Sequence, residues 1–211
     1  MTTTLDRPGL RSALADERIL AIVRGTDPDA CVESVATLAE VGISLVEVSL
    51  TTTDALSVIE RVAASWPDVL LGAGTVITAA QARDVRAAGA RFVVTPGSSP
   101  GADAADELGL PVLVGCLTPS EVIAADQAGR LVKLFPAAPL GLSYFRALRD
   151  PFPAVPLVPV GGVDAELASA YLAAGALAVG VGSPLLGDAP RGGSRADLRQ
   201  RATAFRAAVT P

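Results

Sequence analysis

The sequence predicts an α/β protein of one domain, residues 1–211, folded as a closed (β/α)8 barrel with short loops. Eight short apolar runs alternate with alanine-rich segments of helical length along the chain. The runs are continuously apolar, as is typical of parallel strands buried on both faces. A weak internal repeat spans about two βα units. Eight such units in series favour a closed barrel over the structural alternative, an open doubly wound sheet.

The predicted strands are rich in aliphatic and β-branched residues, and most of them end at or beside Gly or Pro. Before the first strand we expect a helical extension over about residues 1–18. The chain is near the lower size limit for this fold, so the loops must be short. The strands are predicted at 19–25, 44–50, 69–76, 91–97, 111–117, 130–136, 156–162 and 177–183.

Helices are predicted between the strands, for example at 27–42, 78–90, 118–129 and 164–176. Several open on a capping residue followed by Pro or a carboxylate, as at Asp27-Pro28, Thr118-Pro119 and Asp164. They close on glycines that belong to the repeat and recur at intervals of roughly 40 to 47 residues. These glycines are Gly42, Gly89, Gly129 and Gly175.

Composition excludes several classes of protein. A net charge of -5 and the lack of a basic stripe argue against nucleic-acid binding. No uninterrupted apolar stretch reaches about 18 residues, so we expect no membrane span, and the N-terminus lacks the apolar core of a signal peptide. The two cysteines, Cys31 and Cys116, are too few for a disulfide framework, which favours the cytoplasm.

The chain contains no histidine, which removes the commonest transition-metal ligand and the commonest general base. Chemistry at this protein must therefore use carboxylate, lysine, hydroxyl, arginine or backbone groups. We expect neither a metal nor a cofactor, although a magnesium site built from carboxylates alone is formally possible.

Lys133 lies in the middle of the sixth predicted strand, in "RLVKLFP". Strand periodicity turns its amine to the same side as Leu131 and Phe135, toward the barrel interior. The plainer alternative is a lysine at a sheet edge that reaches solvent. Burial lowers the pKa of a lysine and makes its amine a nucleophile toward carbonyl carbon, so Schiff-base chemistry is the main reason to place it there.

Glu47 lies among aliphatic residues of the second predicted strand, in "LVEVSL". It is either a structural carboxylate paired with Arg24 on the first strand or a proton shuttle. Burial raises the pKa of a glutamate toward the working pH, and no histidine is present to do this task. An amine beside a carboxylic acid is the minimal set for forming an imine and moving protons around it.

Residues at the ends of the other strands complete the predicted mouth of the barrel. The glycine segments 160–163 and 180–184 follow strands seven and eight, the usual phosphate position in barrels, and Ser183 adds a hydroxyl donor. Arg24 is suited to a carboxylate or a phosphate, and Thr75 can donate a hydrogen bond to a carboxylate. Thr95 and Pro96 end the fourth strand at the rim. Cys116, at the end of the fifth strand, is predicted as core filling.

From about Ile19 to Ala208 the chain resembles the class I 2-keto-3-deoxy-6-phosphogluconate (KDPG) and 4-hydroxy-2-oxoglutarate aldolases, including the 6-phosphogalactonate type. The motifs that carry the resemblance are "AIVRG", "VEVSLTT", "GAGTV", "VTPG", "PVLVGCLTPSE", "KLFPA", "PVGGV" and "AVGVGSPL". The resemblance implies a TIM barrel, a homotrimer, no metal, and a place in sugar-acid breakdown of the Entner–Doudoroff type.

The resemblance also implies roles for particular residues. Lys133 matches the Schiff-base lysine and Glu47 the acid/base. The other matched positions fall into two groups: substrate binding by Arg24, Thr75, Thr51, Pro96 and Val160, and phosphate binding by Gly161, Gly162, Gly182 and Ser183.

Two positions depart from the gluconate-specific members. Thr51 stands where some of them carry arginine, so carboxylate binding rests more on Arg24 and Thr75. The gluconate-specific members often read "TGG" at 160–162. Here Val160 gives "VGG", as in the galactonate type. This difference bears on stereochemical preference at carbon 4.

The function that these residues imply is cleavage of a 2-keto-3-deoxy-6-phospho-sugar acid to pyruvate and glyceraldehyde 3-phosphate. Cleavage of 4-hydroxy-2-oxoglutarate to pyruvate and glyoxylate is a further implied reaction. Two alternatives are another phosphate-binding barrel lyase or isomerase, and a non-catalytic sugar-phosphate-binding protein.

Overall fold

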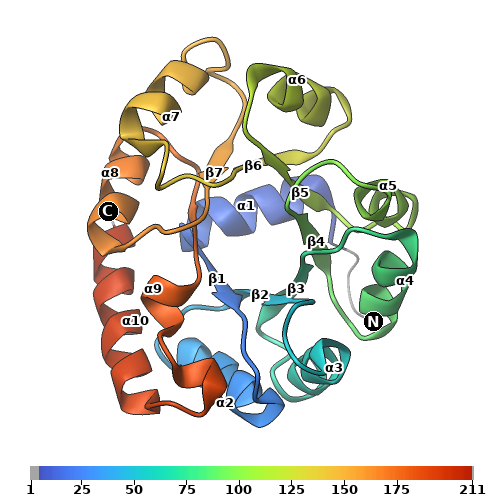
Figure 1. Cartoon of the computed structure of the whole chain (residues 1–211), viewed down its shortest axis with the longest axis vertical. Coiled ribbons are helices and arrows are strands. Elements are labelled where there is room, and N and C mark those ends of the chain that lie inside the picture. The colour runs from blue at the N-terminus through green and yellow to red at the C-terminus, as the bar shows by residue number, and fades with distance from the viewer. Residues whose placement is uncertain (1–4, 211) are drawn as a thin grey trace.

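The strands form one closed parallel barrel (Figure 1). The computed structural model describes residues 5–210. Hydrogen-bonded neighbours follow the order β7-β6-β5-β4-β3-β2-β1-β8. The last seam is closed by a parallel bridge between Val160 and Gly180 and by the Leu177 N–H, which donates to Leu157 O at 3.0 Å. The predicted barrel is confirmed, and the open-sheet alternative is wrong.

The strands lie within the predicted runs and are shorter by a few residues, mostly at their C-terminal ends. They are β1 (Ile19–Val23), β2 (Leu45–Ser49), β3 (Leu70–Gly74), β4 (Phe92–Thr95), β5 (Val112–Cys116), β6 (Leu131–Leu134), β7 (Leu157–Pro159) and β8 (Val179–Val181).

Helices surround the barrel (Figure 1). They are α1 (Arg7–Glu17), α2 (Pro28–Glu40), α3 (Ala55–Ser65), α4 (Ala79–Ala87), α5 (Pro100–Glu107), α6 (Pro119–Gln127), α7 (Gly141–Arg149), α8 (Ala165–Ala173), α9 (Ser183–Leu186) and α10 (Arg195–Val209), with the 3-10 helix η1 (Ala189–Arg191) between the last two. Among the described residues, none of these helices is long and apolar enough to cross a bilayer.

The predicted helix boundaries have the expected local causes. The Asp27 side chain accepts the Ala30 N–H at 3.0 Å, and Thr118 forms a capping box with Glu121. The four repeat glycines have φ between 74° and 103°, a region that L-residues with side chains rarely adopt. In each two-unit repeat, one helix therefore ends at a turn that favours glycine.

The helix α1 closes one end of the barrel. Its Leu10 and Leu14 are buried in a cluster with side chains near the N-terminal ends of the strands. Because this end is filled with apolar side chains, a ligand has access only from the opposite, C-terminal end. The N-terminal extension was expected over about residues 1–18. Residues 7–17 form α1, and residues 1–4 of that expectation lie outside the described residues.

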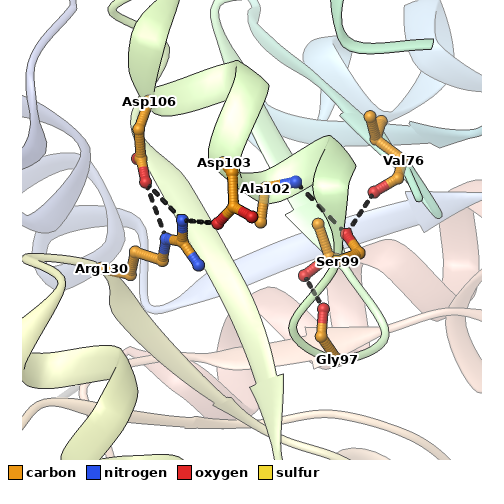
Figure 2. A network of polar contacts seen from close by, with 8 residues as sticks. Val76, Gly97, Ser99, Ala102, Asp103, Asp106 and Arg130 are labelled. Atoms are coloured by element: carbon orange, nitrogen blue, oxygen red, sulfur yellow. Dashed lines mark hydrogen bonds and ion pairs between the residues drawn. The ribbon is translucent and has the colours of Figure 1, made fainter. Parts of the chain in front are cut away.

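An ionic cluster holds α5 against the start of β6, the strand that carries Lys133 (Figure 2). The Arg130 side chain, 10% exposed, donates to Asp103 Oδ1 at 2.6 Å and to Asp106 Oδ2 at 2.7 Å. In the same view, Ser99 caps α5 by accepting the Ala102 N–H at 3.2 Å. These contacts fix β6 from outside the barrel.

Candidate active site

A cavity of about 830 Å³ opens at the C-terminal ends of the strands. Most of its lining residues lie at the end of a strand or within a few residues after it, and they converge from most of the barrel. The site residues singled out in the sequence come together here: Lys133, Glu47, Arg24, Thr75, Thr51, Pro96, Val160, Gly161, Gly162, Gly182 and Ser183.

Lys133 faces the barrel interior, as strand periodicity predicted, and is 7% exposed. Leu131, two residues earlier on the same face, belongs to the inner apolar cluster. The Nζ atom lies 4.9 Å from the centroid of the Phe135 ring. Burial lowers the pKa of the Lys133 amine, the Glu47 charge opposes that shift, and Arg24 adds to it. The alternative of a lysine reaching solvent at a sheet edge is wrong.

Glu47 is 2% exposed and faces the same cavity from β2. Burial raises the pKa of its carboxyl group, against the opposing charges of Lys133 and Arg24. Its Oε2 atom has no hydrogen-bond partner, and within residues 5–210 no ion pair joins Glu47 to Arg24. The alternative of a structural Glu47–Arg24 pair is therefore wrong.

Gly74 on β3 makes room for this carboxyl group. A Cβ atom at Gly74 would lie 1.6 Å from Glu47 Oε1, so any larger residue would displace the Glu47 side chain. The glycine of "GAGT" therefore has a direct physical role in placing Glu47.

Three hydroxyl groups form a chain beside Glu47. Ser49 Oγ lies 2.9 Å from Thr51 Oγ1 and 3.0 Å from Thr75 Oγ1. Ser49 is fully buried, whereas Thr51 and Thr75 line the cavity. Thr75 has φ 62°, an unusual conformation for a β-branched residue that costs on the order of 1–3 kcal/mol. The strained Thr75 and its partner Ser49 thus hold the hydroxyl groups at the mouth.

The seam between β7 and β8 forms the glycine-rich wall. Gly161 and Gly162 have φ 101° and 73°, and Gly182 and Ser183 lead into α9. A Cβ atom at Gly180 would lie 2.6 Å from a Val160 methyl group, so Gly180 gives the Val160 side chain its space. This wall offers backbone groups and one serine hydroxyl to a ligand.

Arg24 follows β1, and its charge acts on both Lys133 and Glu47. It is exposed and lines the cavity. A guanidinium group in this place suits a carboxylate next to the carbonyl carbon that Lys133 would attack.

Metal-ligating side chains do not gather at this mouth. Over the described range 5–210, no three of the Cys, Asp and Glu side chains lie close enough together to hold a metal ion. The expectation of no metal and no cofactor stays a prediction.

A second cavity, of about 720 Å³, lies outside the barrel beside α2, α3 and α4. Its lining includes Asp29, Asp54 and Arg61, and an ion pair of 2.8 Å joins Arg61 to Asp29. It holds neither of the buried ionisable side chains of the barrel mouth.

Comparison with known proteins decides the family. The model for the KDPG and KHG aldolases matches residues 10–191. A probable 2-dehydro-3-deoxy-6-phosphogalactonate aldolase of Rhizobium meliloti is 36% identical over 194 residues, covering 90% of each chain. The chain belongs to the KDPG and KHG aldolase family.

Solved structures agree with this membership. A native KDPGal structure superposes on this aldolase with a TM-score of 0.84 and 31% identity, covering 90% of this chain and 93% of the other. The KDPG aldolase of Legionella pneumophila, with pyruvate captured as a covalent carbinolamine, has a TM-score of 0.80 and 28% identity over 94% of this chain and 95% of its own.

The structure corrects one expectation about the mouth of the aldolase. Thr95 is fully buried, donates to Gly97 O at 2.7 Å and does not line the cavity. On β4 the inward face is set by Phe92 and Val94, so Thr95 points to the helices. Cys116 is buried in the outer core, as predicted, and burial raises the pKa of its thiol to about 12.

Sequence reasoning missed Ser49, the role of Gly74 and the cavity residue Arg191. Ser49 lies two residues after Glu47, so strand periodicity was an available signal for it. Arg191 lies beyond the last strand, in the short 3-10 helix η1, whose position no periodic pattern predicts.

Proposed function

We propose that this aldolase forms a Schiff base between Lys133 and the keto carbon of its substrate, with Glu47 as the proton-transfer group. One observation carries the proposal: two buried ionisable side chains face the same cavity, and burial favours the neutral form of each. A neutral amine is nucleophilic, and a carboxyl group with a raised pKa exchanges protons near neutral pH.

The reaction follows from these two groups. The neutral Lys133 amine adds to carbon 2, and the carbinolamine takes the proton of the Glu47 carboxyl group and loses water, which leaves a protonated imine and a Glu47 carboxylate. The Glu47 carboxylate takes the proton of the carbon-4 hydroxyl group while the bond between carbons 3 and 4 breaks. The electrons of that carbon–carbon bond pass to the imine and form an enamine, and glyceraldehyde 3-phosphate leaves. Glu47 then returns its proton to carbon 3, and water hydrolyses the protonated imine to pyruvate and the free amine, while the released proton goes back to the Glu47 carboxylate.

The remaining residues of the mouth bind the two ends of the substrate in this proposal. Arg24, Thr75 and Thr51 hold the carboxylate near Lys133, and Pro96 shapes the adjoining wall. Arginine suits a carboxylate because its guanidinium group donates two parallel hydrogen bonds.

The glycine-rich wall binds the phosphate group at the other end. Gly161, Gly162 and Gly182 allow close approach of the backbone, and Ser183 adds a hydroxyl donor. Support comes from the place of this wall after β7 and β8, the usual phosphate position in such barrels.

The preferred substrate is 2-dehydro-3-deoxy-6-phosphogalactonate in this proposal. Val160 gives the cavity wall an aliphatic side chain, where a threonine would offer a hydroxyl group that can bond to the substrate. The relatives named above include a probable 6-phosphogalactonate aldolase. We expect Val160→Thr to shift the ratio of kcat/KM values toward the gluconate epimer, and an unchanged ratio would remove Val160 from the account.

Kinetics of two variants separate the lyase mechanism from its rivals. Lys133→Met should abolish pyruvate release, and Glu47→Gln should lower kcat by about 10²–10⁴-fold. Activity that survives in Lys133→Met but is lost with a chelator would favour a metal mechanism. Sugar-phosphate binding by the unaltered protein, without any turnover, would favour a binding protein.

We also propose a homotrimer that works in the cytoplasm. The trimer rests on the family resemblance, and the compartment on two buried free thiols, Cys31 and Cys116, that form no disulfide. Light scattering after gel filtration should give three times the chain mass of 21.3 kDa, whereas a monomer mass would contradict the trimer.

A further inference from the structure

The charges of the cavity are divided between its deep part and its rim. Lys133 and Glu47 are buried, whereas Arg24 and Arg191 are exposed. The Arg24 charge shifts the pKa of both buried groups, whereas the Arg191 side chain lies at the C-terminal end of α9, where it bonds to Gly187 O at 3.3 Å. The two arginines therefore serve different parts of the cavity, Arg24 near the reactive pair and Arg191 away from it.

Arg191 is held beside the β8 end of the cavity. Its Nη2 atom donates to Gly187 O at 3.3 Å, at the C-terminal end of α9. Arg201 in turn fixes α9 by donating to Leu185 O at 2.8 Å and to Leu186 O at 2.9 Å. The Arg191 guanidinium thus lies by the short helix that begins at Ser183.

The backbone before Arg191 is anchored to the neighbouring strand end. Pro190 O accepts the Asp27 N–H at 3.4 Å and the Cys31 thiol at 3.5 Å. A Cβ atom at Gly25 would lie only 1.9 Å from Pro190 O, so glycine is needed for this approach. Since β1 pairs with β8, these contacts fix η1 over the ends of those two strands, where Gly182 follows β8.

The Arg191 guanidinium has unused capacity for an anion. In the part of the chain that the structure describes, it forms no ion pair, and its bond to Gly187 O is long, at 3.3 Å. The glycine wall supplies only neutral donors, whereas a phosphate monoester carries nearly two negative charges at pH 7. A guanidinium group matches phosphate oxygens in geometry and charge.

We infer that Arg191 is a specificity-determining residue that binds the terminal phosphate and makes the enzyme select phosphorylated over unphosphorylated keto acids. The inference rests on the proposed function for the identity of the substrate. In this inference the phosphate group contacts a positively charged side chain from η1 in addition to the neutral donors of the glycine-rich wall.

The test compares one sugar acid with and without its phosphate group. Arg191→Ala should lower kcat/KM for 2-dehydro-3-deoxy-6-phosphogalactonate about tenfold or more, and leave that for the unphosphorylated acid within about twofold. Arg191→Lys should retain part of the selectivity, because lysine keeps the positive charge but lacks the planar guanidinium donors that bind a phosphate with two hydrogen bonds. The exposed Arg83→Ala on α4 makes the same change in net charge outside the cavity and should alter neither value.

A binding measurement separates this inference from the proposed reaction. Calorimetry with glycerol 3-phosphate should give a Kd about tenfold higher for Arg191→Ala than for the unaltered protein. If that Kd and the ratio of the two kcat/KM values are both unchanged, the inference is overturned. If the Kd rises while no sugar acid is cleaved, the inference stands and the proposed function fails.

Discussion

At the scale of single residues, the site depends on glycines that leave space for its side chains as much as on the reactive groups themselves. Glu47 keeps its position because Gly74 has no side chain, and Val160 because Gly180 has none. The Glu47 carboxyl group is left with one buried oxygen that has no partner. Such an atom costs stability in the native state and is tolerated where it serves the chemistry.

Glu47→Gln should therefore stabilise the protein while it removes proton transfer. The folded-state pKa of Glu47 is raised, so the native state binds more protons than the unfolded chain above the usual value of about 4.3. Its ionisation costs stability increasingly as pH rises through the window between those two pKa values. We expect the gain from glutamine to be larger at pH 8 than at pH 4.5, measured by thermal unfolding. A variant that is less stable than the parent at pH 8 would contradict this account of Glu47.

Ser49 is a positioning residue for the two threonines at the mouth. Ser49→Ala removes the oxygen that both Thr51 and Thr75 contact, and leaves the backbone of β2 in place. We expect KM to rise several-fold with kcat within about twofold, because in the proposed function the hydroxyl groups bind the carboxylate and do not move protons. Exposed Ser57→Ala on α3 is the matched control. A fall in kcat with constant KM would disprove this role.

Much of the site was predictable because two simple rules place it. Parallel strands end at one face, and side chains alternate, so Lys133, Glu47 and Arg24 had to converge. Thr95 also obeys the second rule: Phe92 and Val94 face inward, so counting from Phe92 would have placed Thr95 on the outward face and corrected the expectation. Ser49 and Arg191 depend on side-chain distances and on a loop path, which residue patterns do not encode.

At the scale of elements, α1 closes the N-terminal end of the barrel, and the glycine turns end several of the helices around it. Leu10 and Leu14 fill its N-terminal end, and Arg206 of α10 donates to Glu17 O and Oε2, both at 3.0 Å. The turn glycines were evident in the sequence because they recur with the repeat. Exact strand ends were not, because an apolar run continues past the residue where the backbone leaves the sheet, as at Val76 and Pro136.

Leu14→Ala tests how much the packing of α1 against the barrel contributes to stability. Leu14 is fully buried, so its truncation leaves a cavity in the inner core and should lower the free energy of unfolding by about 2–5 kcal/mol. Arg11→Ala on the exposed side of α1 should change it by less than about 0.5 kcal/mol. Urea denaturation measures both. Equal effects of the two changes would mean that α1 does not seal the barrel.

At the scale of the whole molecule, one architecture serves two purposes. Closure of eight strands buries Lys133 on the sixth and Glu47 on the second, which are not neighbours in the sheet, and turns both toward one cavity. The count of eight units in the sequence was enough to predict closure. The narrow β7–β8 seam, closed by the Val160–Gly180 bridge, was not predictable, because only three residues of each strand remain in the sheet.

The most direct measurement is reductive trapping on the protein itself. Incubation with pyruvate and borohydride, followed by peptide mass mapping, should add one reduced pyruvate to Lys133, the single lysine of the sequence, and none to the α-amino group of the N-terminus. The rate of trapping should rise with pH at values below the usual lysine pKa of about 10.4, because burial lowers the pKa of this amine. An enzyme that cleaves its substrate yet carries no adduct at Lys133 would contradict the account.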